Sequence, residues 1–342
     1  LVRSEFHGGT FRSSRGSSLR LIQRLAVLLV ATLVAACSLA APEGETVAFD
    51  SATPKFIDDL LTGAAMPAVT VNSRLMVPSG PPPWPAVVLL HSASGQGAID
   101  WAYADLLLSD GFAVLAVDSF RPRGAFRTVQ DQTEVSEVAM VLDAFAARDV
   151  LAADPRIDPE RIAVVGFSKG GIAAFYASLE RVRSAAGGVP FAAHVAHYPW
   201  CGLRLRDPVT TGAPILIQAG SSDTVTPVVL CQQFVDEITA VDPDPNIELV
   251  IYEGARHAFD HPALSAIGWL PVSGMLPGDC LIVEQPGGDF LETSTGQAVS
   301  GENLADVLTS CGRNAAEAGG DSDAADLARD RLRTFLAEHL QP

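Results

Sequence analysis

The sequence lacks the short motifs that mark several common kinds of binding site. It contains no Gly-x-Gly-x-x-Gly pattern and no P-loop, and its histidines and cysteines do not have the close spacing typical of metal ligands. We therefore expect neither a metal nor an organic cofactor. No internal repeat or low-complexity tract interrupts the chain either, and 342 residues with 48% hydrophobic content can bury one large core.

Basic residues are few. The 23 Lys and Arg stand against 40 Asp and Glu, which gives a net charge of −17. Nucleic acid and anionic membrane surfaces attract positively charged proteins, so neither is an expected partner of the folded domain. The net negative charge affects solubility, and we infer no cationic substrate from it.

The apolar run near the N-terminus is short. Leu25–Ala36 has 12 residues, fewer than the ~20 that a membrane-spanning helix needs, and it follows an arginine-bearing, serine-rich stretch. Val34–Cys37 resembles a bacterial lipobox, which implies that Cys37 is lipidated and becomes the first mature residue. We expect residues 1–36 to be a lipoprotein-type signal peptide and the exported protein to be anchored in a membrane through Cys37, in the periplasm or at the cell surface. Small residues also suit ordinary signal peptidase, so a secreted protein is the alternative.

Cysteine is scarce as well. Four cysteines follow Cys37, and an even number in an exported chain predicts two disulfides. Three pairings are possible. We favour Cys201 with Cys231, which both follow strand-like segments, and Cys280 with Cys311, which would close a glycine-rich excursion. Buried free thiols are the alternative.

The chain then alternates between strand and helix patterns. Residues 37–56 have no apolar periodicity and are expected to be a tether, followed by one domain at 57–342. Strands are expected at Ala68–Val77, Ala86–Leu90, Phe112–Val117, Ile162–Val165, Phe191–Tyr198, Pro214–Gln218 and Ile247–Tyr252, and helices at Trp101–Ser109, Glu134–Ala152, Gly171–Leu179 and Asp323–His339. This alternation predicts an α/β fold, with a mostly parallel sheet covered on both faces and ligands bound beyond the carboxyl ends of its strands.

A serine motif joins one expected strand to the next helix. Gly166–Gly170 fits the pattern G-x-S-x-G, in which glycines flank a serine because strand and helix approach too closely for larger side chains. Ser168 would then be exposed above the strand ends. The N–H groups at the start of the following helix would be free to stabilise an oxyanion. A Gly-Ser turn without chemistry is the alternative, and the strand before and helix after favour a nucleophile.

Two further residues follow later strands. Asp223 comes after the sixth expected strand and His257 after the last, so both should lie at the sheet edge where Ser168 emerges. The order serine, aspartate, histidine is the order of catalytic triads in α/β-hydrolases. Asp223 could instead cap a helix or stabilise a turn. Asp260 is the nearest rival acid.

The loop after the second expected strand, His91–Gly95, is the place where an α/β-hydrolase donates a second oxyanion N–H. We expect this donor to be Ala93 or its neighbour Ser92, acting with the N–H of Lys169. A plain turn is the alternative. His91 at the strand end is interpreted as structural.

At this point the chain resembles the dienelactone hydrolase-like branch of the α/β-hydrolases, over about 68–260 and the final helix. Asp118–Gly124 and Tyr198–Cys201 look like recurring segments of its exported members. Dienelactone hydrolases proper have a cysteine nucleophile where this chain has Ser168, and a glutamate where it has Ser92. The resemblance implies the α/β-hydrolase fold and an ester-hydrolysing site, with lactones as an open possibility.

We therefore expect a serine hydrolase of small carboxylic esters. Ser168 would attack the carbonyl, His257 would take and return the proton, and Asp223 would orient His257. A peptidase on the same fold and a non-catalytic binding lipoprotein are the alternatives. Residues 261–320 form a long excursion before the final helix, either a substrate-shaping cap or a partly ordered insertion.

Overall fold

The computed structural model describes residues 41–340 apart from 243 and 244. The expected signal peptide and Cys37 lie outside these residues. Within them, every helix is too short or too polar to cross a membrane.

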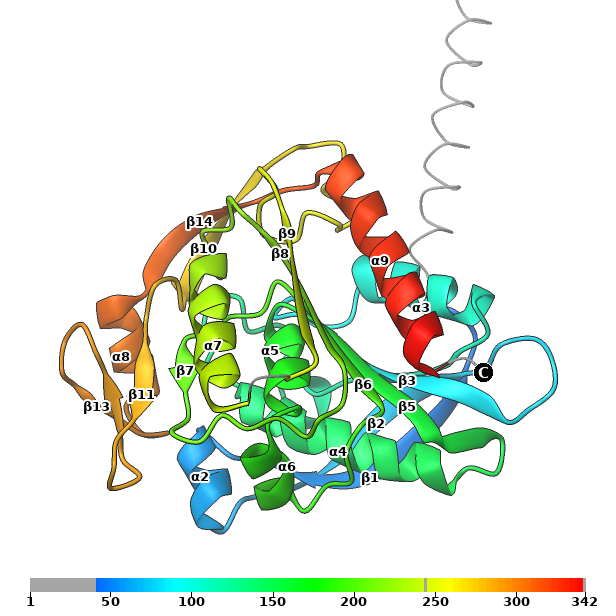
Figure 1. The fold of residues 1–342 in the computed structure, drawn as a ribbon, viewed down its shortest axis with the longest axis horizontal. Helices are drawn as coiled ribbons and strands as arrows, with labels where there is room; N and C mark the ends of the chain where they lie inside the picture. The colour runs from blue at the N-terminus through cyan, green and yellow to red at the C-terminus, as the bar shows by residue number, and fades with distance from the viewer. Residues whose placement is uncertain (1–40, 243–244, 341–342) are drawn as a thin grey trace, which may run out of the picture. The chain divides into compact units, whose positions relative to one another are not determined.

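The centre of the domain is an eight-stranded sheet with the strand order β1-β2-β4-β3-β5-β6-β8-β9. The first two pairings along this order are antiparallel and the remaining ones are parallel (Figure 1). This is the α/β-hydrolase fold with a mostly parallel sheet that the sequence predicts. The strands are β1 (Glu45–Ala52), β2 (Ala68–Met76), β3 (Trp84–Leu90), β4 (Ala113–Val117), β5 (Ile157–Phe167), β6 (Ala193–His197), β8 (Ile215–Gly220) and β9 (Ile247–Tyr252).

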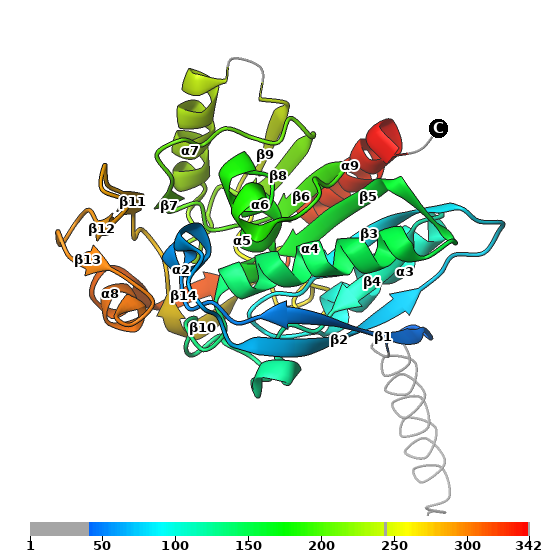
Figure 2. The same ribbon diagram turned by 90° about the horizontal axis from the view of Figure 1, so that it is seen from below.

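Helices cover both faces of this sheet. Side chains alternate along a strand, so in β3 Val87 and Leu89 pack into one apolar core while Val88 and Leu90 pack into the other. The core that contains Val87 and Leu89 also contains residues of α3 and α9. The core that contains Val88 and Leu90 also contains residues of α2, α4, α5, α6 and α7 (Figure 2). These helices are α2 (Ile57–Thr62), α3 (Ala98–Ser109), α4 (Glu137–Ala153), α5 (Lys169–Tyr176), α6 (Glu180–Ala186), α7 (Val228–Val241) and α9 (Ser322–Leu340).

The prediction of a tether at 37–56 is wrong for most of the residues of this segment that the structure describes. β1 pairs with β2 along its whole length, from Glu45 opposite Leu75 to Ala52 opposite Ala68. Only Phe49 of β1 is fully buried, since β1 is the edge strand and its backbone supplies most of the pairing. Such a strand has no strong apolar alternation, which explains why the sequence pattern did not reveal it.

The excursion at 261–320 is folded and joined to the domain. Its β10 (Leu270–Leu276) pairs with β14 (Arg313–Ala318). Its β11 (Ile282–Glu284) extends a small sheet that begins with β7 (Leu203–Arg204) and continues through β12 (Phe290–Glu292) and β13 (Ala298–Val299). Helix α8 (Leu304–Cys311) follows. In Figure 1 these elements lie together beside α7.

Two disulfides are present in the described residues, with the expected pairing. Cys201 is bonded to Cys231, and Cys280 is bonded to Cys311. The first bond ties the segment after β6 to α7. The second joins the residues that follow β10 to the end of α8.

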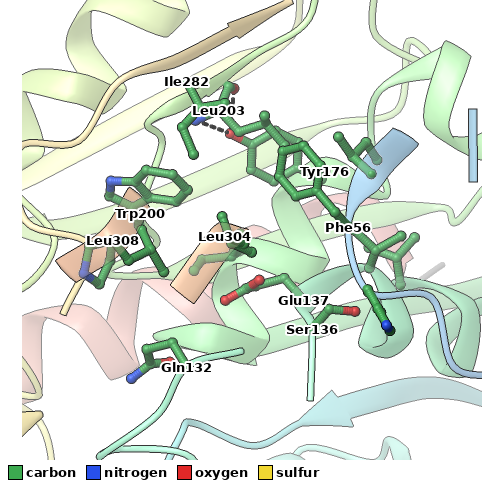
Figure 3. Close-up of a pocket in the computed structure, with 16 residues that line it drawn as sticks. Phe56, Gln132, Ser136, Glu137, Tyr176, Trp200, Leu203, Ile282, Leu304 and Leu308 are labelled. Carbon is green, nitrogen blue, oxygen red and sulfur yellow. Dashed lines mark hydrogen bonds between the residues drawn. The ribbon is translucent and has the colours of Figure 1, made fainter. Parts of the chain in front are cut away.

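The excursion meets α2, α4 and α5 across a small apolar cavity (Figure 3). The Tyr176 hydroxyl donates to the Leu203 carbonyl at 2.6 Å and accepts the Leu203 N–H at 3.1 Å, which closes one side of it. The volume is about 40 Å³, little more than one water occupies, and most of the lining residues are apolar. This region is therefore a packing interface between excursion and domain. Prominent lining residues are Phe56, Trp200, Ile282, Leu304 and Leu308.

Candidate active site

The serine motif forms a sharp turn between β5 and α5. Ser168 has φ 51° and ψ −111°, a strained conformation for a residue other than glycine. The flanking glycines allow it. A Cβ on Gly166 would lie 2.0 Å from the Gly170 carbonyl oxygen, and a Cβ on Gly170 would lie 2.3 Å from the Leu90 oxygen. Larger residues at either position would force strand and helix apart.

The three residues proposed from the sequence lie side by side. Nε2 of His257 is 2.9 Å from Oγ of Ser168, and Nδ1 of His257 is 2.7 Å from Oδ2 of Asp223. Each residue follows a parallel strand, β5, β8 or β9, so all three emerge at the carboxyl edge of the sheet. In this geometry the imidazole can accept the serine proton while the buried carboxylate holds the ring.

Asp223 is held by donors that the sequence analysis did not identify. Its Oδ1 atom accepts the N–H groups of Val225 at 2.8 Å and Thr226 at 2.9 Å. Its Oδ2 atom accepts the Thr226 hydroxyl at 2.8 Å, and that hydroxyl is also 3.1 Å from Nδ1 of His257. Donors to both oxygens fix the orientation of this carboxylate. An aspartate followed three residues later by threonine before a helix is a turn signal that could have pointed to Thr226.

The rival acid Asp260 faces elsewhere. It accepts the hydroxyl of Tyr198 at 2.9 Å and that of Tyr103 at 2.5 Å. Burial, and then the charge of Asp260, raise the pKa of both phenols well above the usual value, so both keep their protons and donate. The ring of Tyr198 in turn lies 4.9 Å from the ring of His257. Asp260 therefore supports a side chain that packs on the histidine.

The expected oxyanion donors border the same cleft. Lys169 is the first residue of α5, so its N–H has no acceptor within the helix. Ser92 and Ala93 line the cleft next to Ser168. Their loop is fixed, because the Ala93 carbonyl accepts the Thr128 N–H at 2.7 Å and the Ser92 carbonyl accepts the Gly95 N–H at 3.0 Å.

The side chain of Lys169 is buried and does not line the cleft. Its Nζ atom lies 2.8 Å from Glu137 at the start of α4 and donates to the Gln132 carbonyl at 2.5 Å. Gln132 lines the cleft. This lysine thus fastens a wall of the cleft to the serine turn, a role that the sequence motif does not reveal.

His91 is buried behind the loop. Its Nδ1 atom donates to the Ser92 carbonyl at 2.8 Å, and its Nε2 atom accepts the Ser119 N–H at 3.2 Å. Burial lowers the pKa of this imidazole, which keeps it neutral in the tautomer that these partners require. Both ring nitrogens of His91 form hydrogen bonds within the protein, which agrees with a structural role for this histidine.

The cleft above Ser168 has a volume of about 270 Å³. The excursion forms one wall of it, through Leu264, Leu270, Val272, Leu276 and Ala318. In the part of the chain that the structure describes, no group of three or more His, Cys, Asp or Glu side chains is arranged to hold a metal ion.

Comparison with known proteins gives a consistent result. A model of the dienelactone hydrolase family matches residues 71–267. Two curated relatives, the uncharacterized proteins MT2364 and Rv2307c of Mycobacterium tuberculosis, are each 29% identical over 187 residues. The match covers 51% of this chain and 63% of each relative, less than two thirds of their length.

Solved structures resemble the chain at lower identity. The structure named m3DLH is 17% identical with a TM-score of 0.55, and the alignment covers 89% of this chain and 99% of that one. A dienelactone hydrolase-like promiscuous phosphotriesterase from metagenomic libraries is also 17% identical, with a TM-score of 0.49 and coverage of 86% and 99%. The first of these likenesses supports the fold.

Proposed function

This chain belongs to the dienelactone hydrolase family, and we propose that it hydrolyses carboxylic esters with Ser168 as the nucleophile. The observation that carries the proposal is the hydrogen-bonded series from Ser168 through His257 to Asp223, with distances of 2.9 and 2.7 Å. The substrate would be a small ester bound in the cleft above Ser168.

In the first half of the reaction, Oγ of Ser168 attacks the carbonyl carbon while Nε2 of His257 takes its proton. The N–H groups of Lys169 and Ala93, with Ser92 as the alternative second donor, would stabilise the oxyanion. The bond from carbon to the alcohol oxygen then breaks, and His257 returns the proton to the leaving alcohol. An acyl-enzyme remains on Ser168.

In the second half, a water molecule loses a proton to His257 and attacks the acyl carbon. The tetrahedral intermediate releases Ser168, which recovers its proton from His257 as the carboxylic acid leaves. Asp223 holds Nδ1–H of His257 throughout and stabilises the imidazolium. The donors from Val225 and Thr226 keep the carboxylate in place for this role.

Serine is the nucleophile in this proposal, because the four described cysteines are all in disulfides. Lactones, which are internal esters, are a possible substrate class by the same chemistry. A peptidase and a non-catalytic binding protein are the competing functions. The bonded series at Ser168 favours a catalyst over a binding protein.

We also propose that the protein is exported and anchored through a lipidated Cys37, with secretion as the alternative. Two disulfides are consistent with an oxidising compartment. Metabolic labelling with a fatty acid tests the anchor: wild type should incorporate label and Cys37→Ser should not.

The test of the catalytic proposal is Ser168→Ala, assayed on short-chain ethyl and nitrophenyl esters and on matched amides and lactones. Wild type should cleave esters and react covalently with a fluorophosphonate at Ser168. The variant should lose on the order of 10⁴ in kcat while keeping its melting temperature. Full activity of Ser168→Ala, or a wild type that is inert to both esters and fluorophosphonate, would contradict the proposal.

A further inference from the structure

The wall of the cleft around Ser168 has no charged side chain. In the described part of the chain, none of the residues that line it is Lys, Arg, Asp or Glu. The branched aliphatic residues of the lining are Ile99, Val129, Val225, Leu264, Leu270, Val272 and Leu276. Four of these seven belong to the excursion. The excursion therefore supplies most of the aliphatic surface that a substrate meets.

Two of the three titratable groups in the lining, His261 and Tyr198, are held neutral. Burial lowers the pKa of His261, so this imidazole carries no charge at neutral pH. The phenol of Tyr198 keeps its proton because it donates to Asp260. His257 is the third titratable group, and it belongs to the reaction itself.

The cations next to the catalytic residues are already paired. Lys169, beside Ser168 in sequence, is buried against Glu137 at 2.8 Å. Arg256, beside His257, lies 2.9 Å from Glu317. Neither side chain lines the cleft.

From this lining we propose that the preferred substrates are uncharged esters with an apolar acyl chain of short to medium length, and that the excursion selects against esters bearing a carboxylate. The inference rests on the proposed function and narrows it. A cleft of about 270 Å³ is at the lower limit for small-molecule sites, which fits a short to medium chain. A carboxylate placed against the aliphatic wall would lose its hydration without gaining a cation or a donor in return.

A matched pair of substrates tests the charge alone. Ethyl hexanoate and monoethyl adipate have the same chain length, and the second has a carboxylate in place of the terminal methyl group. We expect kcat/KM for monoethyl adipate to be lower by about 100-fold or more at pH 8, because burial of an unpaired charge is costly. Equal values, or a preference for the adipate ester, would overturn the inference while leaving ester hydrolysis established.

A designed cation should shift the ratio. Leu270 lines the cleft and is 39% exposed, so Leu270→Arg can place a guanidinium at the cleft mouth without burying it. We expect this variant to raise the ratio of adipate to hexanoate kcat/KM by about 10-fold. Leu264→Arg provides a second position in the same wall if Leu270→Arg lowers the melting temperature.

The control is Ile267→Arg, which adds the same charge nearby at a residue that is 55% exposed and does not line the cleft. Its ratio should match that of wild type. An equal shift in Ile267→Arg, or no shift in folded Leu270→Arg and Leu264→Arg, would show that the excursion wall does not set the preference. Failure of the proposed function is a separate result, in which wild type hydrolyses neither ester and Ser168 is not labelled by fluorophosphonate.

Discussion

The hydroxyl of Thr226 lies 2.8 Å from Oδ2 of Asp223, the carboxylate oxygen that also contacts Nδ1 of His257 at 2.7 Å. A side chain outside the proposed triad therefore helps to position its acid. The Tyr198 carbonyl, at 3.1 Å from the same hydroxyl, is a second and more distant acceptor for its single proton.

Thr226→Val should lower kcat by about 10-fold and leave KM nearly unchanged, because a hydrogen bond to a charged group contributes about 1.5–3 kcal/mol and the two backbone donors remain. Thr226→Ser should recover most of the loss. The pH dependence of kcat/KM should also shift in Thr226→Val and not in Thr226→Ser, since the hydroxyl acts on the Asp223–His257 pair. A Val variant with wild-type kcat and pH profile would show that the hydroxyl has no positioning role.

Asp223 and Asp260 should respond differently to the same change. Asp223→Asn should reduce kcat by on the order of 10⁴, since an amide cannot hold the required tautomer of His257 or stabilise its protonated form. Asp260→Asn should mainly lower the free energy of unfolding, because it leaves two buried phenols with a poorer acceptor. Steady-state kinetics and urea unfolding of both variants check this. A larger catalytic loss in Asp260→Asn would mean that the acid is misassigned.

Asp100 should make stability depend on pH. Burial raises the pKa of this carboxyl to about 7, and among the described atoms its Oδ1 has no hydrogen-bond partner. The pKa of Asp100 in the folded state exceeds its unfolded value of about 3.9. The stabilising contribution of Asp100 to the free energy of unfolding is therefore complete below pH ~4 and is lost as the pH rises to 7. The loss is at most about 1.4 kcal/mol per pH unit in this window.

Urea unfolding of Asp100→Asn at pH 4.5 and pH 8 measures this effect. The stability of the variant relative to wild type should increase from the lower to the higher pH. Asp105→Asn is the matched control, because Asp105 is exposed on the same helix. A relative stability of Asp100→Asn that does not change with pH would contradict the prediction.

The Cys280–Cys311 disulfide should affect both stability and substrate binding. It closes a segment with a sequence separation of 31, so replacement of both cysteines by serine should lower the free energy of unfolding by about 3–4 kcal/mol. The bond joins the residues that follow β10 to the end of α8, directly before β14, and both strands contribute side chains to the cleft, so KM for apolar esters should rise more than kcat falls. Calorimetry and kinetics of the double variant check both effects. An unchanged melting temperature, or a loss confined to kcat, would speak against this role.

The sequence by itself was enough to predict the parallel strands, the helices α3, α4, α5 and α9, and the serine turn. These features depend on residues close together in the chain: β-branched runs for buried strands, and Gly166 and Gly170 for the close approach of strand to helix. The order of Ser168, Asp223 and His257 could be read in the same way, because parallel strands bring their carboxyl ends to one edge. The favoured cysteine pairing is also the one that the structure contains.

The tertiary structure alone decided which distant side chains meet. It placed β1 on β2, although the β1 segment has little apolar pattern, because backbone pairing at a sheet edge does not require one. It turned Asp260 towards two tyrosines and brought Thr226 to Asp223. It also laid the excursion along the cleft, so that Leu270 and its neighbours line the substrate space. Such contacts join residues that are far apart in the chain, and no periodic pattern in the sequence indicates which of them meet. The contacts form only when the packing of the whole sheet fixes the position of each loop.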